Sequence, residues 1–212
     1  MDETLSAVEE ADVGDWFTFA VGDGRPLQGE GDAGALRFAV TAFLDGRVFE
    51  QISLEVNVVG ANDRRPIELV TVRRNPFEFI GEPLVTIPMI TPGQQRAEKL
   101  HAFTRRYDDG RSSRAKDLFD MLVIADQVQL ADSAALSDIA EATFVIRGTP
   151  WPPELLPPPR DWAGPWHGFT VDYPLRWRDI DEAFDALRRF WLPLFDGPDG
   201  QMTWSPSTWT WT

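Results

Sequence analysis

The hydrophobic pattern of this chain changes near residue 90, and the change limits the folds that it can adopt. Before that point apolar and polar residues alternate, and β-branched or aromatic residues are frequent. This pattern is typical of strands and covers the runs 16–21, 36–44 and 48–59. Asp45-Gly46 joins the last two runs and predicts a tight hairpin turn. With shorter strands near 67–72 and 85–90, the pattern predicts a mainly antiparallel sheet lobe over residues 1–90.

After residue 90 the pattern becomes helical. Thr91 can cap a helix and Pro92 suits its first turn. Besides a short helix at 2–13, helices are expected over 92–106, 112–128, 132–146 and 179–195. The proline-rich run at 150–160 predicts a stiff connector, and the Trp204–Trp211 tail is expected to pack on the body. The fold class is therefore α+β, with a helical lobe over residues 91–212.

Composition narrows the class of protein. The chain has no cysteine, and no stretch approaches the roughly 20 apolar residues that span a bilayer. Its first residues are acidic, which is unlike a secretory signal, so a cytoplasmic protein of bacterial type is expected. A net charge of −14 argues against general nucleic-acid binding. Residues 64–116 are nevertheless locally basic, which fits either one phosphate-binding cleft or a solvated basic face.

Lysine is rare in this chain. Only Lys99 and Lys116 are lysines, and the other eighteen basic residues are arginines. Lysine carries a compact charge on a flexible stem and can reach a single phosphate oxygen, whereas arginine presents a planar fork. The two positions are therefore candidates for phosphate contact, although two lysines kept by chance would look the same.

Lys99 and Asp117 are expected on consecutive helices that form a hairpin. Their spacing predicts that the two side chains face one another near the first turn of the second helix, where backbone N–H groups and the helix dipole favour an anion. A triphosphate site needs such positive groups with a carboxylate nearby. The same spacing also suits a structural ion pair. If the segment is a triphosphate site, forked contacts could come from Arg105, Arg106, Arg111 and Arg114.

The segment A-E-K-L-H-A from Ala97 to Ala102, followed by R-A-K-D-L-F-D from Arg114 to Asp120, resembles the AbiEii/AbiGii-type nucleotidyltransferase toxins of type IV toxin–antitoxin systems. The resemblance implies a polymerase-β-like nucleotidyltransferase lobe whose active site is completed by the helical lobe. It implies that Lys99 contacts an NTP, that Asp117 is an essential acid, and that Arg114 and Lys116 help to bind the nucleotide.

The resemblance also implies cofactors and partners. Glu55 falls on the expected strand where the family often has a further metal-facing carboxylate, usually an aspartate, so it is the candidate metal ligand and third catalytic residue. The implied cofactor is Mg²⁺, the implied substrates are an NTP and the acceptor end of an RNA such as tRNA, and the implied partner is a cognate antitoxin.

One part of the family pattern is missing. The family has a Gly-Ser or Gly-Gly pair followed by a metal-binding D-x-D on a strand, and residues 1–15 contain neither. The D-x-D at Asp179-Ile180-Asp181 precedes an amphipathic helix and is expected to cap it. Two functions remain open: a shortened transferase with impaired activity, or a non-catalytic remnant that binds a nucleotide or a partner. A second chain or the tryptophan tail is expected to cover the sheet edge at 16–21.

Overall fold

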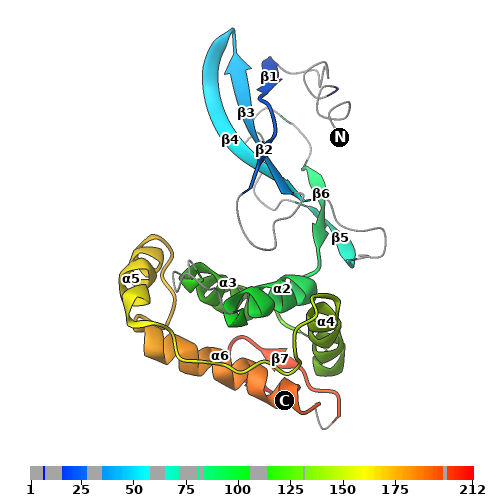
Figure 1. Ribbon diagram of the computed structural model, residues 1–212, viewed down its shortest axis with the longest axis vertical. Coiled ribbons are helices and arrows are strands. Elements are labelled where there is room, and N and C mark those ends of the chain that lie inside the picture. The colour runs from blue at the N-terminus through cyan, green and yellow to red at the C-terminus, as the bar shows by residue number, and fades with distance from the viewer. Residues whose placement is uncertain are drawn as a thin grey trace. The chain divides into compact units, whose positions relative to one another are not determined.

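The computed structural model divides into two compact units, Met1–Arg64 and Arg65–Thr212, whose elements are drawn in Figure 1. The residues that it describes are 7, 16–27, 35–57, 65–71, 81, 84–105, 114–130, 132–197 and 200–212. The expected helix at 2–13 lies outside these residues, apart from Ala7. The boundary between the units falls before the hairpin at 67–90, which we expected in the sheet lobe; the predicted domain boundary at 90 stays a prediction.

The first unit contains an antiparallel sheet in which one long strand pairs with every other strand. The central β3 (Ala35–Leu44) pairs with β1 (Phe17–Val21) and β2 (Arg25–Pro26), and separately with β4 (Arg47–Asn57). Asp45 and Gly46 both have positive φ, 50° and 71°, as a two-residue hairpin turn requires. The strands and the turn predicted from the alternating pattern are therefore confirmed.

The two faces of this sheet differ in chemistry because successive residues point to opposite sides. On one face, Phe38 lies opposite Leu54 and Val40 opposite Ile52. On the other, Arg37 lies opposite Glu55 and Ala39 opposite Ser53. The apolar face holds Phe38, which is buried, but Ile52 stays largely exposed.

The second unit begins with a two-stranded antiparallel hairpin and continues as helices. A short hairpin at the C-terminal end closes the unit. In order, its elements are β5 (Ile67–Thr71), β6 (Thr86–Ile90), α2 (Pro92–Thr104), α3 (Ala115–Gln127), α4 (Ser133–Ile146), η2 (Arg160–Trp162), α5 (Ala163–Asp172), α6 (Ile180–Phe195), β7 (Trp204–Ser205) and β8 (Thr210–Trp211).

Helix starts follow the expected capping chemistry at three places. Thr91 Oγ1 accepts from Gln94 N at 3.3 Å, and Asp132 Oδ1 accepts from Ala135 N at 3.0 Å. Asp179 Oδ1 accepts from two backbone N–H groups of the first turn of α6, at 2.8 and 3.2 Å. The D-x-D at 179–181 is therefore a helix cap, as predicted.

Two helices differ from the sequence prediction. α3 begins at Ala115 after Arg114, which makes no side-chain capping bond, and so starts later than expected. α5 was not predicted, because Gly164, Pro165 and Gly168 lower the helix propensity of this segment. Its buried Trp166, whose indole N–H donates to Arg178 O at 3.2 Å, ties the helix to the core. Tertiary packing overrides local propensity here.

The core of the second unit is rich in tryptophan. Trp166, Trp191 and Trp204 are almost completely buried. Trp204 donates from its indole to Ala125 O at 2.7 Å, and Trp211 donates to Phe190 O at 2.8 Å, so the C-terminal hairpin packs on α3 and α6. This confirms that the tail packs on the body, while cover of the edge at 16–21 by the tail or a second chain stays a prediction. Across the described part of the chain, no helix has the length and apolar character needed to cross a membrane.

Candidate functional site

The two helices that carry the lysine–aspartate motif lie side by side in the second unit. Their contact is made by small and apolar residues, with Ala97 and Leu100 on α2 and Leu118 and Met121 on α3 all buried. At the edge of this contact, Lys99 Nζ lies 3.2 Å from Asp117 Oδ1, and Asp117 is in the first turn of α3. The predicted meeting of these two side chains is therefore present.

Three cations and two carboxylates form one network around Lys99, which we call the Lys99 cluster: Lys99, Arg114, Lys116, Asp117 and Asp120. Lys99 Nζ is 2.6 Å from Asp120 Oδ2, and Lys116 Nζ is 2.8 Å from the same oxygen. Arg114 Nη1 is 3.2 Å from Asp117 Oδ2. The cluster has one positive charge more than it has negative charges, which suits an incoming anion.

Electrostatics keep Lys99 charged. Partial burial acts to lower the pKa of Lys99, but the hydrogen bond to Asp120 and the charges of Asp117 and Asp120 outweigh it, so the pKa is raised. About a third of the side chain remains exposed (31%). Lys99 is thus a permanent ammonium that solvent can reach. Of the other arginines named from the sequence, Arg105 ends α2, and Arg106 and Arg111 lie outside the described residues.

Sequence reasoning missed Arg96, which lies one turn before Lys99 on α2. Its guanidinium is buried and donates from Nη2 to Ile124 O at 2.8 Å and to Val128 O at 3.2 Å, at the C-terminal end of α3. It also lies 5.5 Å from the centre of the Phe190 ring. Burial lowers the pKa of Arg96 to about 9. Arg96 and Lys99 together hold α3 at two points along its length.

Another side of α2 carries a second ionic contact. Glu98 Oε2 accepts from Arg147 Nη2 at 2.7 Å, and Glu98 Oε1 lies 3.4 Å from Arg65 Nε. Gln94 Nε2 donates to both Glu98 Oε1 and Thr143 Oγ1. These bonds join α2 to α4 and to the residues before β5, so that α2 is held on two sides.

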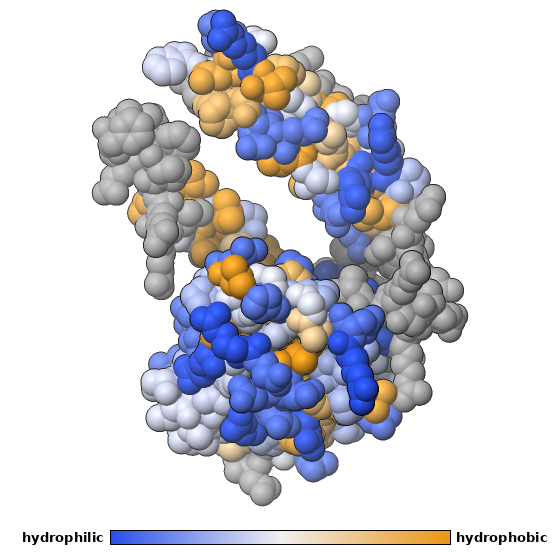
Figure 2. Space-filling model, turned by 90° about the vertical axis from the view of Figure 1, so that its left-hand side faces the viewer, coloured by the Kyte–Doolittle hydropathy of each residue, from blue (hydrophilic) through white to orange (hydrophobic). Residues whose placement is uncertain are grey.

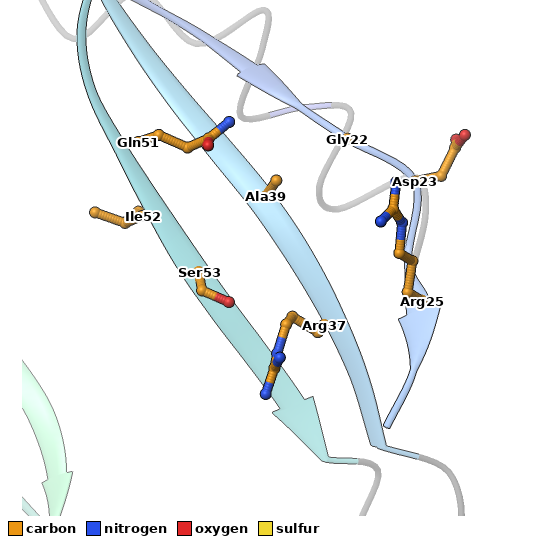
Figure 3. A pocket seen from close by; sticks show the side chains of 8 residues that line it. All are labelled: Gly22, Asp23, Arg25, Arg37, Ala39, Gln51, Ile52 and Ser53. Carbon is orange, nitrogen blue, oxygen red and sulfur yellow. The ribbon is translucent and has the colours of Figure 1, made fainter. Parts of the chain in front are cut away.

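Glu55, the predicted metal ligand, lies on the polar face of the sheet in the first unit. Its Oε1 accepts from Arg37 Nη2 at 2.5 Å and from Arg37 Nε at 3.0 Å, and each side chain is about half exposed. A hollow of about 490 Å³ opens on this face, lined by Arg25, Arg37, Gln51 and Ser53 among others. In Figure 3 the side chains of Gln51 and Ser53 lie on the side of β4 opposite to Ile52. Alternate residues of two paired strands point to the same face of a sheet. The odd-numbered residues 37, 51, 53 and 55 could therefore have predicted this polar face from the sequence.

The carboxylates of the Lys99 cluster and of Glu55 already have cationic partners. Asp117 and Asp120 contact Lys99 and its neighbours, and Glu55 contacts Arg37. Within the described ranges, no three His, Asp or Glu side chains come together as a metal-binding group would. These residues therefore do not form a Mg²⁺ site by themselves.

The α+β architecture described above is similar to the fold of a solved nucleotidyltransferase toxin. The structure is similar to that of MenT4, a nucleotidyltransferase toxin from Mycobacterium tuberculosis H37Rv, with a TM-score of 0.56 and 18% sequence identity. The similarity covers 98% of this chain and 66% of MenT4, so the chain spans just under two thirds of that toxin.

The family follows from a separate comparison. Residues 1–190 match the family model described as nucleotidyl transferase AbiEii toxin, type IV TA system. The chain therefore belongs to the AbiEii nucleotidyltransferase toxin family, as the motif in α2 and α3 predicted. No curated protein matches the sequence.

Proposed function

We propose that the Lys99 cluster is the nucleotide-binding half of a nucleotidyltransferase site, and that the reaction is transfer of a nucleotide from an NTP to the acceptor end of an RNA such as tRNA. One observation carries the proposal. In a member of the AbiEii family, a partly exposed ammonium and an acid on the first turn of the next helix meet at 3.2 Å.

Four side chains of the cluster, those of Lys99, Arg114, Lys116 and Asp117, have a role in this proposal. The Lys99 ammonium donates to oxygens of the triphosphate, and Arg114, at the start of α3, adds a forked contact. Lys116 is mostly exposed and adds positive charge at the mouth of the cluster. Asp117 remains fixed by Arg114 and orients the attacking hydroxyl or a bound partner.

The reaction of this family generally uses a divalent metal ion such as Mg²⁺, which would neutralise the charge of the triphosphate. Glu55 is the candidate ligand in the first unit, and it would have to leave Arg37 to bind a cation. Glu55, Asp117 and Asp120 would each have to give up a cationic partner to bind the ion, so we expect slow transfer by this chain.

The alternative is a protein that binds a nucleotide, or a partner such as an antitoxin, without transferring anything. The single D-x-D of the sequence favours it, because Asp179 caps α6 instead of facing a metal. Where the alternative protein binds a nucleotide, both functions require Lys99 for that binding. They differ only in whether a labelled nucleotide reaches RNA.

The test measures NTP binding and transfer of labelled NTP to RNA for the wild type, Lys99→Ala and Asp117→Asn. Removing a charge-assisted hydrogen bond should weaken NTP binding about tenfold or more in Lys99→Ala. Arg188→Ala, which removes an exposed cation on α6, is the charge control and should bind normally. Unchanged binding by Lys99→Ala would contradict the proposal. Binding without any transfer by the wild type would favour the non-catalytic alternative, and transfer that persists in Asp117→Asn would exclude the role of Asp117.

A further inference from the structure

Lys99 is closer to an acid that has no role in the function proposed above. Its Nζ lies 2.6 Å from Asp120 Oδ2 and 3.2 Å from Asp117 Oδ1. Asp120 in turn receives Lys116 Nζ on both oxygens, at 3.0 and 2.8 Å. The ammonium that is expected to meet the nucleotide is therefore held most tightly by Asp120.

Each acid of the cluster has a second cation besides Lys99. Asp117 keeps Arg114 at 3.2 Å, and Asp120 keeps Lys116. A partly buried carboxylate that loses its only partner is costly. Here Lys99 can leave both acids without leaving either carboxylate unpaired. This is what a lysine that changes partners requires, whereas a permanent ion pair between helices would need only one cation for each acid.

We propose, on the basis of the function proposed above, that Asp120 is a positioning residue that holds the Lys99 ammonium in the nucleotide-free protein and releases it to the triphosphate. Lys116 then neutralises Asp120 alone. Triphosphate and Asp120 compete for the same ammonium protons, so the contact with Asp120 lowers the affinity for the nucleotide. It also keeps the Lys99 ammonium beside the first two turns of α3, where the triphosphate would bind.

The experiment is a double-mutant cycle on binding. Affinities for ATP and for inorganic tripolyphosphate are measured by calorimetry in the wild type, Asp120→Asn, Lys99→Ala and the double variant. Asp120→Asn removes the carboxylate that competes with the triphosphate for the Lys99 ammonium. This variant should therefore bind both ligands about three- to tenfold more tightly than the wild type. In the Lys99→Ala background the same change should have no effect. A general effect of removing a negative charge would instead persist there.

The matched control lies on the same helix. Asp126 is exposed to the same extent as Asp120, 21% against 20%, and has one ion pair of 2.6 Å, with Arg176. Asp126→Asn should leave both affinities unchanged. If Asp120→Asn fails to fold, as judged by circular dichroism, Asp120→Ser removes the same charge and serves in its place.

A second measurement uses the low lysine content. Protein labelled with ¹³C-lysine gives one side-chain signal for Lys99 and one for Lys116, and Lys99→Ala assigns them. Tripolyphosphate should shift the Lys99 signal of the wild type. With tripolyphosphate bound, the Lys99 signals of the wild type and of Asp120→Asn should have the same position. A Lys99 signal that responds to Asp120→Asn but not to tripolyphosphate would mean a purely structural pair and would overturn the proposal.

The outcomes separate the two proposals. If Lys99→Ala binds nucleotide as the wild type does, the proposed function fails. If Lys99→Ala weakens binding but Asp120→Asn does not strengthen it, or strengthens it equally without Lys99, only the role of Asp120 fails.

Discussion

The helical unit and the sheet unit organise their functional candidates by different means. Of the apolar residues buried among those described, all but Ala35 and Phe38 belong to the second unit. In the sheet unit, Phe49 and Ile52 are 62% and 58% exposed. On the face drawn in Figure 2, the helical unit is covered mainly by hydrophilic side chains, while apolar side chains gather on the sheet. The Lys99 cluster therefore rests on a packed core, whereas Glu55 is placed only by the register of a hairpin.

The ion pairs show the same contrast. Lys99, Asp117 and Asp120 are partly buried and share partners, while Arg37 and Glu55 form an isolated pair that is about half exposed. Exposed pairs contribute little to stability, and networks with partial burial hold their geometry better. The Lys99 cluster is thus preorganised to a greater degree than the polar face of the sheet.

The largest effect should come from the core of the helical unit. Trp204→Ala should lower the free energy of unfolding by about 4 kcal/mol, because it leaves a cavity and an unpaired Ala125 carbonyl. Leu54→Ala on the sheet should cost about 1 kcal/mol, since Leu54 is only partly buried. Chemical denaturation of both variants measures the difference. Equal losses would mean that the sheet unit has a core comparable with that of the helices.

The second largest effect is expected from Arg96→Ala. It should lower the free energy of unfolding by about 3 kcal/mol, because it removes a long buried side chain and two hydrogen bonds to the end of α3. Arg188→Ala, at an exposed position of α6, should change stability by less than about 0.5 kcal/mol. If Arg96 aligns the two helices, its loss should also move the ¹³C-lysine signal of Lys99. An unmoved signal would limit Arg96 to a role in stability.

The coupling energy between charged partners is expected to be smaller than the losses of stability in the two core variants. A double-mutant cycle on Lys99 and Asp120 should give a coupling energy of about 1 kcal/mol, because both groups are partly buried. The same cycle on Arg37 and Glu55 should give about 0.5 kcal/mol or less, falling further in high salt. A stronger coupling on the sheet would reverse the contrast between the two regions.

The smallest effect concerns pH. Burial, followed by the charge of Arg147, lowers the pKa of His101, so the folded protein favours the neutral imidazole. The unfolded chain therefore takes up the proton first as the pH falls through about 6.5. Stability should be greatest above that pH and should decrease below it. Urea titrations between pH 8 and 5 measure this slope, which should diminish in His101→Gln and persist in His167→Gln, where an exposed histidine is changed.

Sequence patterns predicted much of the fold because the deciding signals are local. Alternation placed β1, β3 and β4, the Asp45-Gly46 turn joined β3 to β4, and the caps Thr91 and Asp179 marked the starts of α2 and α6. α5 was missed because its glycines and proline argue against a helix, and tertiary contacts such as those of the buried Trp166 support it instead. Local chemistry therefore predicts an element well when the element does not depend on distant contacts.

The sequence by itself determined the family, the α+β class and the meeting of Lys99 with Asp117, because its motif, its hydrophobic pattern and the spacing of 18 residues across two consecutive helices are local signals. Only the tertiary structure decided that Asp120 is the nearer partner of Lys99, that Arg96 joins α2 to the end of α3, and that Glu55 is paired with Arg37. Those contacts depend on the packing of two helices and on strand register, which bring together residues 18 to 32 positions apart.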